Sequence, residues 1–113
     1  MSVAIKRVYD AADEADGYRV LVDRLWPRGV SKDKAKLDEW LKEVGPSNEL
    51  RMWYGHDPAK FPEFKKRYSI ELSSNPAFAQ LRQLIHEHTV VTLVYSAHDG
   101  EHSQAAVLQE LLA

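Results

Sequence analysis

Two segments of the sequence concentrate polar side chains directly after apolar runs. The first extends from Asp23 to Gly29 and contains Arg24 and Arg28. The second covers residues 95–104 and leads into a helical pattern. Guanidinium groups bind carboxylate and phosphate oxygens through paired hydrogen bonds, and the first N–H groups of a helix attract the same oxygens. The two segments therefore predict a pocket for a small anion, either a phosphate or a carboxylate.

Nine side chains in these segments carry a hydrogen-bonding group or a ring that could contact such a ligand. They are Arg24, Trp26, Arg28, Tyr95, Ser96, His98, His102, Ser103 and Gln104. Structural alternatives stay open beside this interpretation. An arginine can pair with Asp23 simply to bury it, Trp26 can merely pack, and His102 can cap the helix that follows.

Catalytic residues cannot be named from the sequence. Ser96 and Ser103 lack the Gly-x-Ser-x-Gly context of a nucleophilic serine, and no glycine-rich phosphate loop is present. Whether the protein is an enzyme therefore stays undecided at this point.

The histidines do not predict a metal centre. His98 and His102 are four residues apart, but the expected turn at Asp99 and Gly100 would break the shared helical face that two ligands need. No third histidine has motif spacing, and only tertiary structure could bring His56 near. We expect neither a bound metal nor a cofactor.

Composition limits the class of protein. The 113 residues are 44% hydrophobic and 28% charged, which is typical of one soluble globular domain covering residues 1–113. The chain has no cysteine, which excludes disulfides and thiol chemistry, and no apolar run approaches the length of a membrane span. A cytoplasmic location is the expectation, and the oligomeric state is not predicted.

Charge is sorted along the chain although the net charge is only −2. Residues 19–36 carry a local balance of +4 and residues 51–68 one of +3, whereas residues 69–113 carry −4. Such stretches are often ordinary solvated helix faces. They also allow an alternative function, in which both stretches and nearby aromatic side chains bind nucleic acid or another protein. The overall acidity makes nucleic acid the less favoured partner.

Periodicity predicts the elements that must position the two polar segments. Strands are expected over residues 3–9, 19–25 and 89–96, separated by an acidic loop over 10–18 with no face to bury. Helices are expected from Ser31 to Val44, and then after Ser47, Asp57, Asn75 and Asp99. Strands alternating with helices predict an α/β fold, with a small, mostly parallel sheet of about three strands and helices packed on it. An additional edge strand could lie in residues 46–50.

Three motifs resemble a known family over essentially the whole chain. They are Val-Leu-Val-Asp-Arg-Leu-Trp-Pro-Arg-Gly-Val at 20–30, Leu-Arg-Met-Trp-Tyr-Gly-His-Asp-Pro at 50–58, and the ending from Leu93 through Ala105. Together they are similar to the YeaO-like proteins within uncharacterised-domain family 488. This resemblance carries no established activity.

The resemblance also shows departures from the wider family. That family pairs two cysteines with a His-Arg after its last strand. Here Tyr95 and Glu101 stand in place of the cysteines and Ser103 in place of the arginine, while His102 matches the histidine. Thiol or thiolate–metal chemistry in the wider family therefore does not transfer to this chain.

Overall fold

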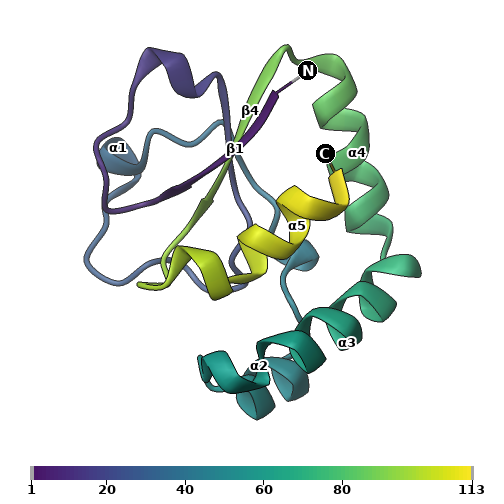
Figure 1. Ribbon diagram of the computed structural model, residues 1–113. Helices are drawn as coiled ribbons and strands as arrows, with labels where there is room; N and C mark the ends of the chain where they lie inside the picture. Colours follow the sequence, from purple (N-terminus) through teal and green to yellow (C-terminus); the bar gives the residue numbers. More distant parts are fainter. Residues whose placement is uncertain (1, 113) are drawn as a thin grey trace.

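Four parallel strands form one sheet in the computed structural model, which describes residues 2–112 (Figure 1). In spatial order they are β1 (Ser2–Arg7), β4 (Val90–Tyr95), β2 (Tyr18–Leu21) and β3 (Glu39–Trp40). The predicted α/β class is confirmed. The prediction that the two apolar strands are adjacent is also confirmed. Strands β2 and β4 pair directly, and neither lies at an edge of the sheet.

The apolar strands are central because both of their faces are covered. Val20, Val22 and Leu93 pack into a large core on one face, whereas Leu21 and Val94 join a smaller cluster on the other. Successive side chains of a strand point to opposite faces, so a continuous apolar run needs cover on both sides.

Helices cover the two faces unequally. The large core packs against α2 (Asn48–Tyr54), α3 (Phe61–Ser73), α4 (Pro76–Glu87) and α5 (Gln104–Leu112). The smaller cluster is covered by α1 (Lys32–Ala35) and its flanking loops, on the left of Figure 1. The expected caps are present, since Ser47 Oγ accepts from the Leu50 N–H and Asn75 Oδ1 from the Ala77 N–H.

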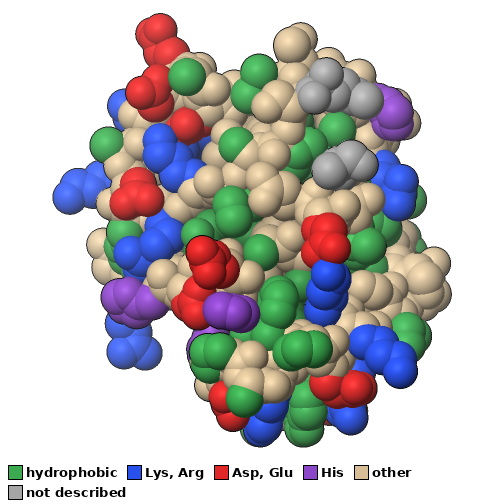
Figure 2. Space-filling model, viewed as in Figure 1, with side chains coloured by type: hydrophobic (Ala, Val, Ile, Leu, Met, Phe, Trp, Pro, Cys, Tyr) green, Lys and Arg blue, Asp and Glu red, His purple; other side chains and the backbone are tan. Residues whose placement is uncertain are grey.

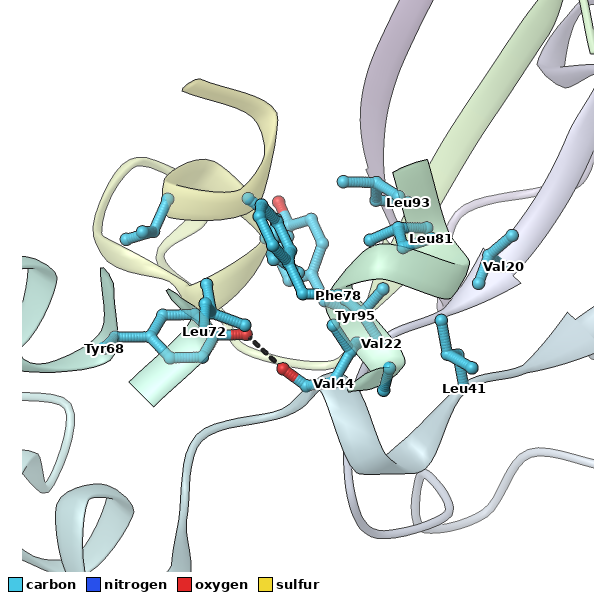
Figure 3. Close-up of a cluster of buried hydrophobic side chains, with 14 of the residues drawn as sticks. Val20, Val22, Leu41, Val44, Tyr68, Leu72, Phe78, Leu81, Leu93 and Tyr95 are labelled. Carbon is cyan, nitrogen blue, oxygen red and sulfur yellow. Dashed lines mark hydrogen bonds between the residues drawn. The ribbon is translucent and has the colours of Figure 1, made fainter. Parts of the chain in front are cut away.

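Tyr68 of α3 joins this helical layer to the connection that follows β3. Its ring is fully buried, and its hydroxyl donates a 2.6 Å hydrogen bond to the carbonyl oxygen of Val44 (Figure 3). Burial raises the pKa of this phenol well above its ordinary value. The contact fixes the backbone that leads into α2, and α2 contributes to the cavity described below.

The predicted helix from Ser31 to Val44 is wrong. After the four residues of α1, Lys36 adopts a left-handed conformation with φ 46°, and the chain then pairs with β2 as β3. The N–H of Asp38 donates to Arg19 O at 2.9 Å, and that of Leu41 donates to Leu21 O at 2.9 Å. Hydrogen bonds to an otherwise open sheet edge outweigh the helical spacing of the apolar residues.

This correction also changes the strand count from about three to four. The additional edge strand is real, but it lies at Glu39–Trp40 and not within residues 46–50, which lead into and begin α2.

No helix of the described chain combines the length and the apolar character needed to cross a membrane. The cytoplasmic location stays a prediction.

Candidate functional site

A cavity of about 990 Å³ opens at the carboxyl edge of the sheet, and we call it the strand-end pocket. Its walls come from the segments that follow β1, β2 and β4, together with the end of α2. The chain leaving β2 passes to α1 on one face, whereas the chain leaving β4 passes to α5 on the other. Such a divergence opens a crevice between neighbouring strands, the usual ligand position in open α/β sheets. Figure 2 shows basic, acidic and histidine side chains gathered at the lower left of the view, beside the chain between β4 and α5.

Asp23 is a buried carboxylate in the wall of this pocket. Its Oδ2 accepts hydrogen bonds from Ser96 N at 2.9 Å and Ser96 Oγ at 2.7 Å, and its Oδ1 accepts one from Gln104 Nε2. Burial raises the pKa of Asp23, although the two bonds from Ser96 oppose the shift. The carboxylate ties the end of β2 to the end of β4 and to the start of α5. The alternative in which an arginine neutralises Asp23 is therefore not the one observed.

Arg24 is held instead by the chain that follows β3. Its Nε donates to the carbonyl oxygen of Pro46 at 2.6 Å, and its Nη1 lies 3.6 Å from Glu43 Oε2. Gly45 packs against it so closely that a Cβ atom there would lie 2.9 Å from Arg24 Cγ. Backbone and packing thus fix the guanidinium, while only a weak, largely exposed carboxylate contact balances its charge.

Two further arginines line the pocket with exposed side chains. Neither Arg28 nor Arg51 forms an ion pair with a carboxylate of residues 2–112, and Arg51 Nη2 only donates to Asn48 Oδ1 at 3.3 Å. Arg7 is the fourth arginine of the pocket. Its Nε donates to Ala97 O at 2.9 Å, which holds the side chain against the segment after β4. Among the described residues, four arginines therefore face one cavity together with only two carboxylates, those of Asp23 and Asp99.

Asp99 lies at the outer part of this pocket. Its Oδ2 is 2.6 Å from His102 Nδ1, and this hydrogen bond lowers the pKa of Asp99. The carboxylate is thus already engaged by His102, and the pocket as a whole carries an excess of positive charge.

The structure brings six of the nine predicted contact residues to this cavity. They are Arg24, Trp26, Arg28, Ser96, His98 and Gln104. Whether they contact a ligand stays a prediction.

The other three predicted residues have structural contacts outside the cavity lining. Tyr95 is 5% exposed in the core, and His102 places its ring edge-on against Phe61 at 5.1 Å between centroids. Ser103 is 1% exposed, and its Oγ accepts from the Ala106 N–H as a cap of α5. Because Ser103 already caps the helix, recognition of an anion would fall on side chains more than on the α5 N-terminus.

Several lining residues were not among the sequence candidates. Arg7 is the last residue of β1 and Tyr9 follows it, while Arg51, Tyr54 and His56 come from α2 and its end. The sequence did contain indications of both sets of residues. The first predicted strand ends at the same sheet edge, and the motif at 50–58 contains several polar residues. What the sequence did not reveal is that α2 packs across this edge.

Within residues 2–112, no three or more His, Cys, Asp or Glu side chains are grouped closely enough to hold a metal ion. Candidate ligand chemistry in the strand-end pocket is therefore that of guanidinium, hydroxyl, amide and imidazole groups.

Comparison with known proteins places these features in a family. A family model described as "Inactive DUF488-N3 subclade" matches residues 2–113. An uncharacterized protein of Mycobacterium tuberculosis, and one of Mycobacterium bovis, are each 48% identical over 110 residues, which cover 97% of this chain and 92% of the relative. Uncharacterized protein YeaO of Escherichia coli is 41% identical over 112 residues, 99% of this chain and 97% of the relative. No solved structure gives a significant match. The chain therefore belongs to the YeaO-like, DUF488-related family, within the subclade described as inactive.

Proposed function

We propose that the protein binds a small molecule carrying a phosphate or carboxylate group in the strand-end pocket. The observation that carries the proposal is that Arg28 and Arg51 face one cavity without carboxylate partners among residues 2–112, beside Arg7 and Arg24. Like charges held near one another repel, and a bound anion offsets that repulsion with paired hydrogen bonds. The ligand would thus supply the counter-charge that this pocket lacks.

We propose binding without a chemical step. The family description calls this subclade inactive, and this chain has Tyr95 and Glu101 where the wider family has cysteines. In the pocket, the Ser96 hydroxyl donates directly to the Asp23 carboxylate at 2.7 Å. A carboxylate is a weak base for a serine hydroxyl, so this contact orients Ser96 rather than activating it.

The structure gives the nucleic-acid alternative no specific support. Arg19 of the first basic stretch is 3% exposed, and in the second stretch Lys65 pairs with Glu110 and Arg67 with Glu63. The aromatic residues Tyr54, Phe64 and Tyr68 are each at most 5% exposed, which leaves little surface on which a base could stack.

Phosphate should raise the melting temperature of the protein, and Arg28→Ala should remove the part of this rise that comes from the pocket. A ligand at about one hundred times its Kd stabilises the folded state by about 2.7 kcal/mol. For a domain of this size, each kcal/mol corresponds to about 4–8 °C. The measurement is thermal unfolding in sodium phosphate against sodium chloride at matched ionic strength.

Phosphate also stabilises proteins through its general effect on water, so the readout is a difference between variants. Lys66→Ala is the matched control, because Lys66 is exposed on α3, lies outside the pocket and carries the same charge. We expect Lys66→Ala to keep the full phosphate response of the parent protein. An Arg28→Ala variant that responds as strongly as this control would overturn the proposal.

A further inference from the structure

We infer that the anionic group of the ligand is attached to a planar ring system, giving a molecule about the size of a nucleoside monophosphate. This inference rests on the proposed anion site and adds the chemical class of the rest of the ligand. The size of the pocket is the first reason. Cavities of roughly 300–1,000 Å³ hold organic ligands of tens of atoms, and a volume of about 990 Å³ lies at the upper end of that range. A bare phosphate would leave most of this space to water.

The second reason is the composition of the walls. Beside the arginines, the pocket is lined by apolar groups from the loop after β2, namely Leu25, Trp26 and Pro27. Leu25 is an apolar side chain within a strongly polar segment, and 62% of it is exposed to solvent. Apolar side chains beside a charged cavity favour a ligand with an apolar body as well as a charge.

The third reason is that two rings of the pocket wall are already fixed in place. Trp26 donates from Nε1 to Val30 O at 2.7 Å, and its ring meets that of Trp40 edge-on at 5.3 Å. Tyr9 donates from its hydroxyl to Arg28 O at 3.1 Å, and the guanidinium of Arg7 lies 5.0 Å from its ring centre. Rings held in this way lose little side-chain freedom on binding, so they favour a flat partner at small entropic cost.

These features place the two parts of the ligand. The anionic group lies among the arginines, and the ring packs against the loop that carries Leu25 and Trp26. Stacking of a base on an aromatic side chain strengthens binding by about five- to 150-fold.

The test compares three probes by calorimetry: adenosine monophosphate, ribose 5-phosphate and inorganic phosphate. We expect the nucleotide to bind at least about ten-fold more tightly than ribose 5-phosphate, which keeps the phosphate but lacks the ring. Trp26→Leu should weaken the nucleotide about ten-fold and leave phosphate unchanged. Because Trp26 also packs against the fold, Leu25→Ala provides a second variant at an exposed position.

Met52→Ala is the matched control for Leu25→Ala. Met52 is an apolar side chain, 77% exposed and outside the pocket, so this variant should bind every probe normally. Equal affinities for all three probes would overturn the ring inference and leave the anion site standing. A ring preference that neither Trp26→Leu nor Leu25→Ala alters would overturn the placement argued above. Failure of all three probes to bind would overturn the phosphate site of the proposed function as well as the ring inference.

Discussion

Replacing Gly17 by alanine should lower the free energy of unfolding by about 3 kcal/mol, more than most single substitutions. Gly17 has φ 64° and ψ −134°, a backbone conformation that few residues other than glycine adopt and that costs about 1–3 kcal/mol. A Cβ atom at this position would also overlap the carbonyl oxygen of Val90, at the start of the central strand β4. A backbone oxygen in a sheet cannot rotate away as a side chain can. The cost is therefore strain plus overpacking.

Gly29→Ala separates these two causes. Gly29 also has a positive φ, 77°, so alanine meets conformational strain there too, but no atom lies within 4 Å of the added Cβ. We expect this variant to lose only about 1–2 kcal/mol. Urea unfolding of both variants measures the difference. Equal losses would show that the Val90 carbonyl adds nothing and that strain alone matters at Gly17.

The loop before Gly17 contains a buried residue that the sequence pattern did not predict. Residues 10–18 read as an acidic loop with no face to bury, yet Asp16 is 9% exposed and contacts two basic side chains. Periodicity detects apolar faces only. It cannot detect a polar residue that is buried because partners on other elements satisfy it.

The pocket could be predicted in part because strand ends are visible in the sequence. Arg24, Arg28, Ser96 and Gln104 follow two apolar runs, and adjacency of those runs was enough to bring them together. Arg51 could not be placed in the same way. It lies on α2, whose position depends on how Tyr68 and the residues around it pack on the sheet.

The mistaken helix over residues 31–44 has a related cause. Leu37, Leu41 and Val44 fit a helical stripe, but Leu41 and Val44 join the large core and Leu37 the small one. Residues that pack on opposite faces of a sheet cannot lie on one helical face. Spacing alone does not distinguish the two arrangements, because both alternate apolar and polar residues at short intervals.

Arg19→Met should destabilise the protein by about 3–5 kcal/mol, because it breaks a buried ion pair from one side. Arg19 Nη1 lies 2.6 Å from Asp16 Oδ2, and its Nη2 donates to Ala35 O at 2.8 Å. The substitution keeps an apolar stem but leaves the Asp16 carboxylate and the end of α1 without this donor. The matched control is Arg67→Met, which breaks an exposed pair with Glu63 and should cost less than about 1 kcal/mol.

The same ion pair makes stability depend on pH in a direction that can be tested. Burial opposes ionisation of Asp16, but hydrogen bonds from the Asp13 backbone, Lys6 and Arg19 hold its pKa below the ordinary value of 3.8. The unfolded chain therefore binds the proton more readily. The stabilisation by ionised Asp16 is fully present above pH 3.8 and is lost as the pH falls through the lower pKa of the folded state.

Arg19→Met should weaken that dependence, because it removes one cause of the lowered pKa and leaves the burial. Urea unfolding of the parent and of Arg19→Met at pH 7, 5 and 3 gives the comparison. We expect the destabilisation to be largest at pH 7 and to shrink by pH 3, because pH 3 lies below the ordinary pKa of 3.8 and the stabilisation by ionised Asp16 is then decreasing in the parent protein. Asp99 and other acids titrate in both proteins, so their contributions cancel in the difference. A destabilisation that is the same at all three pH values would mean that Arg19 acts through its bonds to the α1 carbonyls and not through the charge of Asp16.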